Sequence, residues 1–143
     1  MGANNSAPTS QTLLLTSTFS ECQKLYNFLE DFTRSHDIPD ETFQDLKLIA
    51  EEIVANIINH GYNEAPDKKI EITISANNSN VEVSFIDDAI ACDPLEFAKN
   101  DANIEGMCEG GMGTQIIKSL TSTQDYKRVN ERNVLTITKH YND

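Results

Sequence analysis

The architecture of this chain follows from one segment, Leu46-Lys-Leu-Ile-Ala-Glu-Glu-Ile-Val-Ala-Asn-Ile-Ile-Asn-His-Gly-Tyr62. Its apolar residues recur at spacings of three and four, which predicts a helix with a buried apolar face. The polar residues Glu52 and Asn56 are among those that interrupt this pattern. Because they are four residues apart, their side chains lie on one helical face, with Cβ atoms about 5–6 Å apart.

A carboxylate and an amide on a largely buried helix are costly unless they find partners. A hydrated metal ion with a polyphosphate would supply such partners. Glu52 offers a general base, and Asn56 offers a neutral oxygen to a hard cation such as Mg²⁺. In the structural alternative, Asn56 caps or bridges neighbouring helices and Glu52 simply reaches solvent. The segment by itself leaves both interpretations open.

Size and charge restrict the class of protein. The chain has 143 residues, of which 38% are hydrophobic, so it is long enough for one compact domain with a core. Its formal net charge is -12. A phosphate backbone is repelled by such a surface, which argues against direct binding of nucleic acid. A partner with a basic segment fits this charge better.

We expect neither a secretory signal nor a membrane-spanning helix in this sequence. No apolar run approaches the about 20 residues that a spanning helix needs. The start, Met1 to Pro8, has neither the basic region nor the apolar core of a secretory signal. The odd number of cysteines, Cys22, Cys92 and Cys108, fits reduced thiols better than a disulfide framework. We therefore expect a cytoplasmic protein with no membrane contact.

Flanking patterns predict the remaining elements. Residues 1–10 are expected to be a disordered tail and residues 11–143 a single domain. Asp40 is a candidate N-cap for the helix that ends near Gly61, a residue suited to the left-handed turn after a helix. Segregated helices and antiparallel strands predict an α+β two-layer sandwich, in which a mixed, mostly antiparallel sheet carries helices on one face. The expected strands are 11–18, 70–75, 81–86, 122–129 and 133–139, and the expected helices are 20–36, 40–61, 94–99 and 114–120.

Two further features could belong to the same site as Glu52 and Asn56. Asp87 stands where the second strand of the predicted hairpin ends, and its carboxylate could accept from the exocyclic amine of a purine. Small residues such as Ala89 and Ala91 leave room for a flat ring. Gly110-Gly-Met-Gly113 precedes a helix, whose N-terminus attracts anions. Each feature alone is weak, because glycine pairs usually form turns and Asp-Pro usually starts a helix. Their order along the chain is more specific.

In this order the features resemble the ATPase superfamily of gyrase, heat-shock chaperones, histidine kinases and mismatch-repair proteins, which has the Bergerat fold. Within it the chain is most similar to the small anti-sigma-factor serine/threonine kinases of bacteria. The resemblance covers nearly all of the chain after the tail. Four segments carry it: Glu52-Ile-Val-Ala-Asn56-Ile-Ile-Asn-His60-Gly-Tyr, Asp87-Asp-Ala-Ile-Ala-Cys-Asp-Pro94, Glu109-Gly-Gly-Met-Gly113-Thr-Gln-Ile-Ile, and Arg132-Asn-Val-Leu-Thr-Ile-Thr-Lys139.

The resemblance implies a role for residues of the first three segments, and the fourth resembles the last strand of the family. Glu52 would be the catalytic base, Asn56 the Mg²⁺ ligand and Asp87 the adenine-binding residue. Ala91 would lie beside the nucleotide. The family usually has glycine where this chain has Ala89. The segment implied to support the phosphates of ATP consists of Gly110, Gly111, Met112, Gly113 and Thr114.

The resemblance also implies partners. These are a sigma factor, which is sequestered when bound, an anti-anti-sigma protein, which is the kinase substrate, and a second copy of the chain in a homodimer. Two alternatives remain. One is a nucleotide-dependent binding module that transfers no phosphate, and the other is an interaction domain without enzymatic activity.

Overall fold

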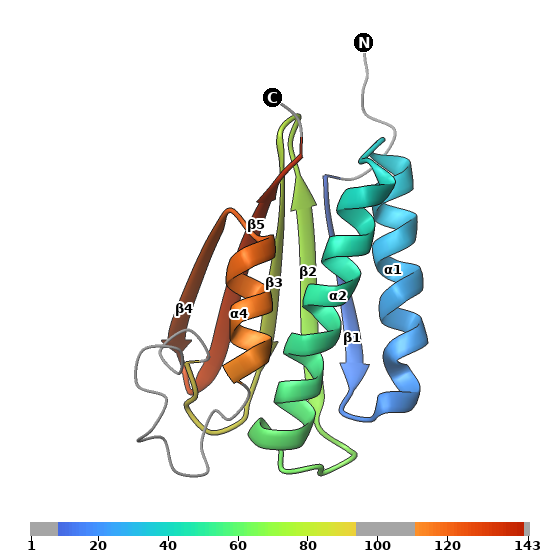
Figure 1. Ribbon diagram of the computed structural model, residues 1–143. Coiled ribbons are helices and arrows are strands. Elements are labelled where there is room, and N and C mark those ends of the chain that lie inside the picture. Colours follow the sequence, from blue (N-terminus) through green and yellow to red (C-terminus); the bar gives the residue numbers. More distant parts are fainter. Residues whose placement is uncertain (1–8, 94–110, 142–143) are drawn as a thin grey trace.

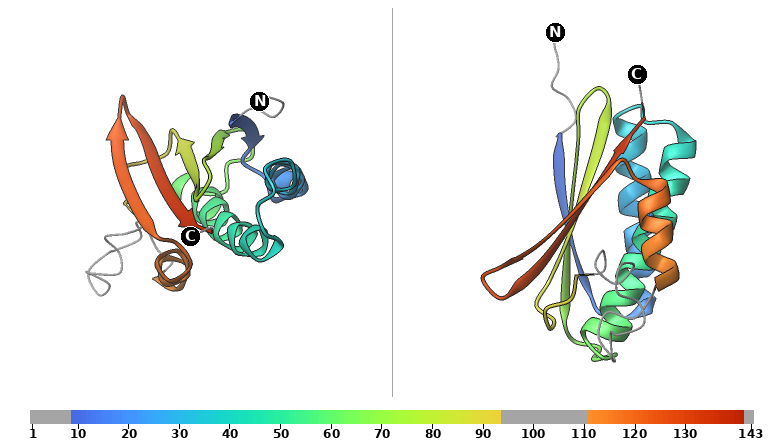
Figure 2. Two further views of the ribbon diagram at one scale, coloured as in Figure 1. Left: turned by 90° about the horizontal axis from the view of Figure 1, so that it is seen from above. Right: turned by 60° about the vertical axis from the view of Figure 1, so that its left-hand side comes forward.

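A computed structural model describes residues 9–93 and 111–141, with the backbone alone for residues 111–114. A five-stranded sheet in the order β1-β2-β3-β5-β4 forms one layer. Helices α1, α2 and α4 pack together on one face of it (Figures 1 and 2). All four strand pairings in the described part of the chain are antiparallel. The predicted α+β two-layer sandwich with helices on one face is therefore confirmed, although the sheet of the described residues is antiparallel throughout and not mixed.

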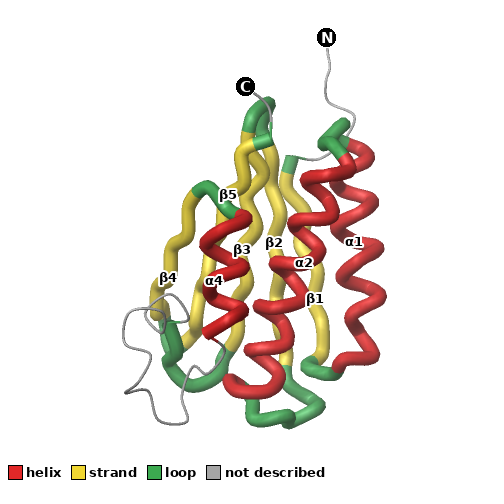
Figure 3. Tube along the Cα trace, in the orientation of Figure 1, coloured by secondary structure: helices red, strands yellow, loops and turns green. Residues whose placement is uncertain are grey.

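The observed elements agree closely with the predicted ranges (Figure 3), except that α4 begins at Gly111, within the glycine-rich segment that was expected to precede it. β1 already begins at Ser10, a residue that we assigned to the tail. The helix predicted at 94–99 and residues 1–8 lie outside the described residues. The strands are β1 (Ser10–Thr16), β2 (Lys69–Ala76), β3 (Asn80–Asp87), β4 (Thr123–Val129) and β5 (Arg132–His140), and the helices are α1 (Cys22–Ser35), α2 (Asp40–Asn56) and α4 (Gly111–Leu120).

Alternation along the strands builds the core. In β2, Ile70, Ile72 and Ile74 are fully buried at 0% exposure, while the residues between them are partly exposed. Burying a side chain of this size contributes about 1.5–3 kcal/mol. A slip of one residue in register would turn all three isoleucines to the opposite face, so the core strongly specifies the pairing. Leu29 of α1 and Ile49 of α2 are buried in the same core.

The start of α2 differs from the prediction. Its N-cap is Pro39, without a side-chain capping bond, and Asp40 is the first residue of the helix. The prediction that Asp40 caps the helix is therefore wrong. Its carboxylate in the first turn still interacts favourably with the positive end of the helix dipole.

The sheet order brings distant parts of the chain together at one end. Because β5 lies between β3 and β4, the last residue of β3, Asp87, is in register with Asn133 at the start of β5. The C-terminal end of α2 and the N-terminal end of α4 lie at the same lower end of the molecule (Figure 1). Segments from four elements therefore meet there.

The turn between β4 and β5 contains a strained residue. Val129 pairs with Arg132, and the two residues between them, Asn130 and Glu131, have φ of 52° and 65°. Two left-handed residues in a two-residue turn are typical of a type I′ hairpin, which strongly prefers Asn-Gly. The left-handed conformation costs a residue with a Cβ about 1–2 kcal/mol.

We expect Glu131→Gly to raise the free energy of unfolding by about 0.5–1 kcal/mol, since relief of this strain exceeds the extra chain entropy of glycine. Urea denaturation measures the change. Glu82→Gly is the matched control, because Glu82 is an exposed residue within β3, where glycine should weaken the strand. Equal losses of stability in the two variants would contradict the strain at Glu131.

Candidate functional site

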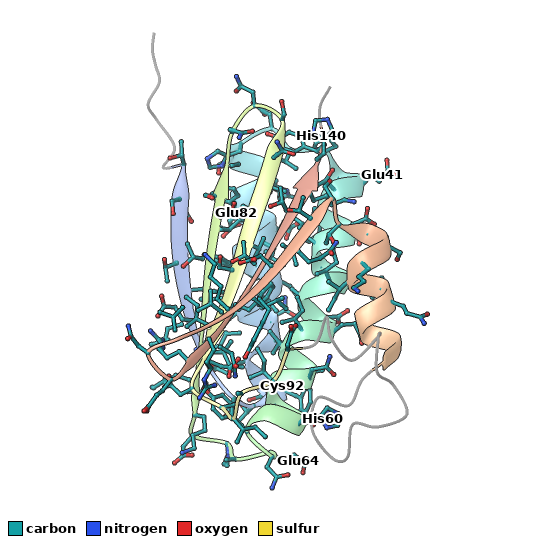
Figure 4. The ribbon with its side chains drawn as sticks, turned by 90° about the vertical axis from the view of Figure 1, so that its left-hand side faces the viewer. Glu41, His60, Glu64, Glu82, Cys92 and His140 are labelled. Atoms are coloured by element: carbon teal, nitrogen blue, oxygen red, sulfur yellow. The ribbon has the colours of Figure 1, made fainter. Side chains whose placement is uncertain are left out.

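A cavity opens at the end of the sheet where α2 ends and α4 begins. Its walls are apolar and come from both layers: Ile53 from α2, Phe85 from β3, Ile117 from α4 and Leu135 from β5. Polar side chains of Asn56, Asp87, Tyr126 and Asn133 also line it. An apolar pocket with a few convergent polar groups is typical of a small-molecule site. Figure 4 labels another lining residue, Cys92, at the lower end of the molecule.

The two polar residues of α2 take different positions. Asn56, the last residue of the helix, is half-buried and lines the cavity. Glu52 is half-buried one turn earlier and is not among the residues that line the cavity. The neighbouring Glu51 accepts a hydrogen bond from the hydroxyl of Tyr26 in α1. Of the two adjacent carboxylates, Glu51 therefore binds α1, and Glu52 has no hydrogen bond to a described residue.

The helix ends in a wider, π-helical turn, Ile57–Gly61. The amide of Tyr62 donates to the carbonyl of Ile57 (2.7 Å), five residues back. The predicted end near Gly61 is confirmed. The residues with left-handed backbone are Asn63 and Glu64, with φ of 54° and 66°, whereas Gly61 is not left-handed. Single π turns within helices occur frequently at functional sites.

Gly61 is required for a close approach. A Cβ built on Gly61 would lie 3.0 Å from the Cβ of Ala89. Ala89 follows the end of β3 and is buried, at 6% exposure. The alanine where the resembling family usually has glycine is thus accommodated because the facing position has no side chain. Ala89 therefore packs against the end of α2.

We expect Gly61→Ala to lower the free energy of unfolding by about 1–3 kcal/mol, the usual cost of inserting a methyl group into a packed contact. Ala89→Gly in the same protein should restore most of this loss, because it removes the facing methyl group. A double-mutant cycle in urea measures the coupling. Strict additivity of the two substitutions would show that this contact does not limit the packing.

Asp87 is the buried carboxylate of the site, at 5% exposure. Its Oδ1 accepts from the amide of Ala89 (2.9 Å) and from Nδ2 of Asn133 (2.9 Å). Its Oδ2 accepts no hydrogen bond from a described residue. Burial raises the pKa of Asp87, against the opposing effect of its two hydrogen bonds; the Asp88 charge raises it too, and the Arg128 charge lowers it. One oxygen of Asp87 is thus held by the protein, and the other can accept from a ligand.

Tyr62 joins the loop after Asp87 to the loop after α2. Its hydroxyl donates to the carbonyl of Lys69 (2.6 Å) and accepts from the amide of Asp88 (2.8 Å). Burial raises the pKa of Tyr62, and the Asp87 and Asp88 charges add to this effect. The hydroxyl therefore remains protonated at neutral pH and fixes the backbone beside Asp87.

The glycine-rich segment is described in part. Gly110 lies outside the described residues. Gly111, Met112, Gly113 and Thr114 form the first turn of α4. The amides of a first helical turn have no partner within the helix and attract anions. This helix start lies at the same lower end of the molecule as the C-terminal end of α2 (Figure 1).

Other predicted features are outside the cavity or absent. Ala91 is exposed and is not one of the residues that line it. Cys22 is a free thiol, but Cys92 is disulfide-bonded, so the expectation of reduced cysteines is wrong for Cys92.

Residues 9–93 and 111–141 contain no group of three or more potential metal-ligating side chains of the His, Cys, Asp and Glu types. No helix among them is long and apolar enough to cross a membrane.

The absence of a cluster of potential metal-ligating side chains from the described residues does not conflict with binding of Mg²⁺. This ion typically keeps several waters and is bound through one or two protein oxygens together with the phosphates of a nucleotide. Asn56 lines the cavity, and its side chain carries one such oxygen. The donor set at the cavity therefore fits a nucleotide with its metal ion.

Sequence reasoning missed Asn133, Tyr126 and Tyr62 as members of the site. A signal for Asn133 was present. Along β5, Asn133, Leu135 and Ile137 alternate with partly exposed residues and are all buried. A polar residue at an inward position of an alternating strand needs a buried partner. The sequence alone did not show that this partner is Asp87.

Comparisons with known proteins show the family of this chain and its fold. A profile of the histidine kinase-like ATPase domain matches residues 15–139. The chain is 28% identical over 108 residues to the serine-protein kinase RsbW of Oceanobacillus iheyensis; the match spans 71% of this chain and 66% of the relative, just under two thirds of its length.

Two solved structures share the fold. The RsbU and RsbW domains of a Mycobacterium tuberculosis protein superpose with a TM-score of 0.66 at 18% identity, over 94% of this chain and 33% of that chain. A chain of the SiaB–SiaC complex from Pseudomonas aeruginosa gives a TM-score of 0.60 at 13% identity, over 90% of this chain and 88% of that chain.

Proposed function

Because the chain belongs to the histidine kinase-like ATPase family, we propose that it binds Mg·ATP and transfers phosphate to a serine or threonine of a partner protein. One observation supports the nucleotide site above all others. The carboxylate of Asp87 is held through Oδ1, keeps Oδ2 available, and lines the same cavity as Asn56. A purine amine needs such an acceptor, and a metal ion on a phosphate chain needs such an oxygen in the same pocket.

Each residue of the proposed site then has a role. Asp87 accepts from the exocyclic amine of adenine, and the walls formed by Ile53, Phe85 and Leu135 cover the ring and exclude water. Asn56 would hold Mg²⁺, and the first turn of α4 would face the phosphates. Bound Mg²⁺ offsets the negative charge of the phosphates during transfer. Glu52 takes the proton from the hydroxyl group of the acceptor.

The partners are proposed from the resemblance to anti-sigma kinases and from charge. A sigma factor would be bound and sequestered, an anti-anti-sigma protein would be phosphorylated, and the chain would act as a cytoplasmic homodimer without direct contact to nucleic acid or membrane. The net charge of -12 would favour association with the basic regions of a sigma factor. Similarity to a serine-protein kinase named RsbW supports this assignment.

A second function, nucleotide-dependent protein binding without phosphate transfer, is favoured by one observation. Glu52 is half-buried and does not line the cavity that contains Asn56 and Asp87. Binding of nucleotide would then need no base, and the partner would respond to ATP or ADP alone.

Calorimetry with Mg·ATP and Mg·GTP tests the nucleotide site, and transfer of a radiolabelled γ-phosphate to proteins of the native host tests the kinase. We expect binding of ATP in preference to GTP, and a labelled serine or threonine in a small partner. Absence of heat with either nucleotide would contradict the nucleotide site. Binding of ATP without any labelled protein would support the second function.

A further inference from the structure

We infer that Asn133 is the positioning residue that directs the Asp87 carboxylate toward the base of the nucleotide, and that Tyr126 and Arg128 of β4 fix Asn133 in turn. This inference rests on the proposed function, because it assigns a task to Asn133 in the same cavity. It concerns residues on the β4–β5 hairpin, for which the sequence motifs indicated no role.

The donor side of the Asn133 amide faces the loop after β3. Nδ2 donates to Oδ1 of Asp87 (2.9 Å) and to the carbonyl of Ile90 (2.9 Å), and it lies 3.4 Å from the carbonyl of Ala89. Both Asn133 and Asp87 are buried, at 6% and 5% exposure. A hydrogen bond to a buried carboxylate is among the stronger ones in proteins. Nδ2 therefore restrains both the Asp87 side chain and the backbone that follows it.

The acceptor side faces the other strand and the far end of the same loop. Oδ1 accepts from the hydroxyl of Tyr126, from Nη1 of Arg128 (3.1 Å) and from the amide of Cys92 (3.3 Å). Nη1 of Arg128 also donates to the carbonyl of Ala89 (2.8 Å). Asn133 thus ties the loop from Asp87 to Cys92 at both of its ends.

This arrangement sets the orientation of the amide. Three acceptors surround Nδ2, and Oδ1 faces an arginine and a backbone amide, which can only donate. If Oδ1 and Nδ2 of Asn133 exchanged places, donors would face donors and acceptors would face acceptors. A single orientation of the amide is therefore favoured. With its donor turned to Oδ1, Asn133 stabilises the ionised form of Asp87 and leaves Oδ2 for the ligand.

Three other charged or titratable groups act on Asp87. Asp88 follows it in the chain and raises its pKa, whereas the Arg128 guanidinium lowers it. Tyr62 lies close enough for the Asp87 charge to raise the tyrosine pKa. None of these groups donates a hydrogen bond to Oδ1 of Asp87, which Asn133 and the amide of Ala89 occupy. The effect of Asn133 can therefore be separated from theirs by substitution.

The decisive variant is Asn133→Asp, which keeps the shape and the acceptor side, replaces the donor by a second acceptor and adds a negative charge at neutral pH. Above neutral pH the introduced carboxylate faces Oδ1 of Asp87, and we expect the Kd for Mg·ATP to rise on the order of tenfold to a hundredfold, the equivalent of one hydrogen bond to a charged group. As the pH falls, the two carboxyls share one proton and the donor is restored. Binding by Asn133→Asp should therefore strengthen toward mildly acidic pH, whereas wild-type binding weakens.

Thr136→Val is the matched control. Thr136 is on the same strand, but its hydroxyl is paired with that of Ser84 (2.9 Å) on the face of the sheet away from the cavity. This variant also loses one side-chain hydrogen bond of β5, and it should keep the wild-type Kd and pH profile. Equal loss of affinity in Asn133→Asp and Thr136→Val would reduce Asn133 to general support of the strand and would overturn the inference.

A measurement without nucleotide separates this inference from the proposed function. In ligand-free protein, titration of the Asp87 carboxyl carbon by NMR should show a higher pKa in Asn133→Leu than in the wild type, and an unchanged pKa in Thr136→Val. An Asp87 pKa that is the same in Asn133→Leu and in the wild type would overturn the positioning role, whether or not ATP binds. Wild-type protein that binds no ATP would overturn the proposed function and, with it, the direction of Asp87 toward a base.

Discussion

Replacing Asp87 by asparagine is expected to weaken Mg·ATP binding by about a hundredfold or more, on the order of 3 kcal/mol. The side chain keeps its size, and its oxygen can still accept from Ala89 and Asn133 at the position of Oδ1. The amide nitrogen of the introduced asparagine then occupies the position of Oδ2. It faces the adenine amine, and because both groups are donors no hydrogen bond forms between them. Isothermal calorimetry on wild type and variant measures the loss.

The same substitution should stabilise the protein without nucleotide. The folded-state pKa of Asp87 is raised above its ordinary value of 3.8, so folding disfavours the ionised form. Protonated Asp87 makes its full contribution to stability at a pH below its pKa in the unfolded protein. This contribution is lost as the pH rises through the pKa of Asp87 in the folded protein. The free energy of unfolding of Asp87→Asn should therefore exceed that of the wild type at pH 7 by on the order of 1 kcal/mol. This difference should shrink toward about pH 4.

Asp88→Asn is the control for this prediction. Asp88 is the exposed neighbour of Asp87, and its carboxylate pairs with Nε of Arg132 (3.1 Å). Its backbone bond to Tyr62 does not depend on the side chain. We expect this variant to bind Mg·ATP within about twofold of the wild type, because an exposed ion pair contributes little. Equal affinities of Asp87→Asn and the wild type would contradict the assignment of Asp87 as the base-binding residue.

Glu52→Gln should lower the rate of phosphate transfer by about 10²–10⁴-fold, the usual contribution of a general base. Binding of Mg·ATP should change little, because Glu52 does not line the cavity and makes no hydrogen bond to a described residue. A rate assay with labelled ATP at saturation, combined with calorimetry, separates the two quantities. Loss of transfer with retained binding is the outcome expected for a base.

Glu51→Gln provides the matched comparison, since it removes the adjacent carboxylate of the same helix. Glu51 accepts from the Tyr26 hydroxyl, and this interaction raises the pKa of Tyr26 to about 12. Its replacement should loosen the contact between α1 and α2 and leave the transfer rate near that of the wild type. If Glu52→Gln transferred phosphate as fast as Glu51→Gln, Glu52 would not be the base.

Local patterns were sufficient to predict the secondary structure and the fold class. The spacing of Ile49, Ile53 and their neighbours predicted α2, and the alternation of Ile70, Ile72 and Ile74 predicted β2. These patterns report which side of an element faces the core, a property that depends on residues only a few positions apart. The placement of Asn56 and Asp87 near one end of the fold followed from the resemblance to ATPases, because spacing alone indicated only separate candidate groups.

The partners of the buried polar groups could not be obtained in this way. Asn133 meets Asp87 because β5 is inserted between β3 and β4. The loop after β3 packs on the end of α2, and Ala89 fits there because Gly61 has no side chain. Both contacts join residues far apart in the chain. Local periodicity determines which residues face inward, but only the packing of the helices on the sheet, with the strand order that results, determines which inward-facing residues touch.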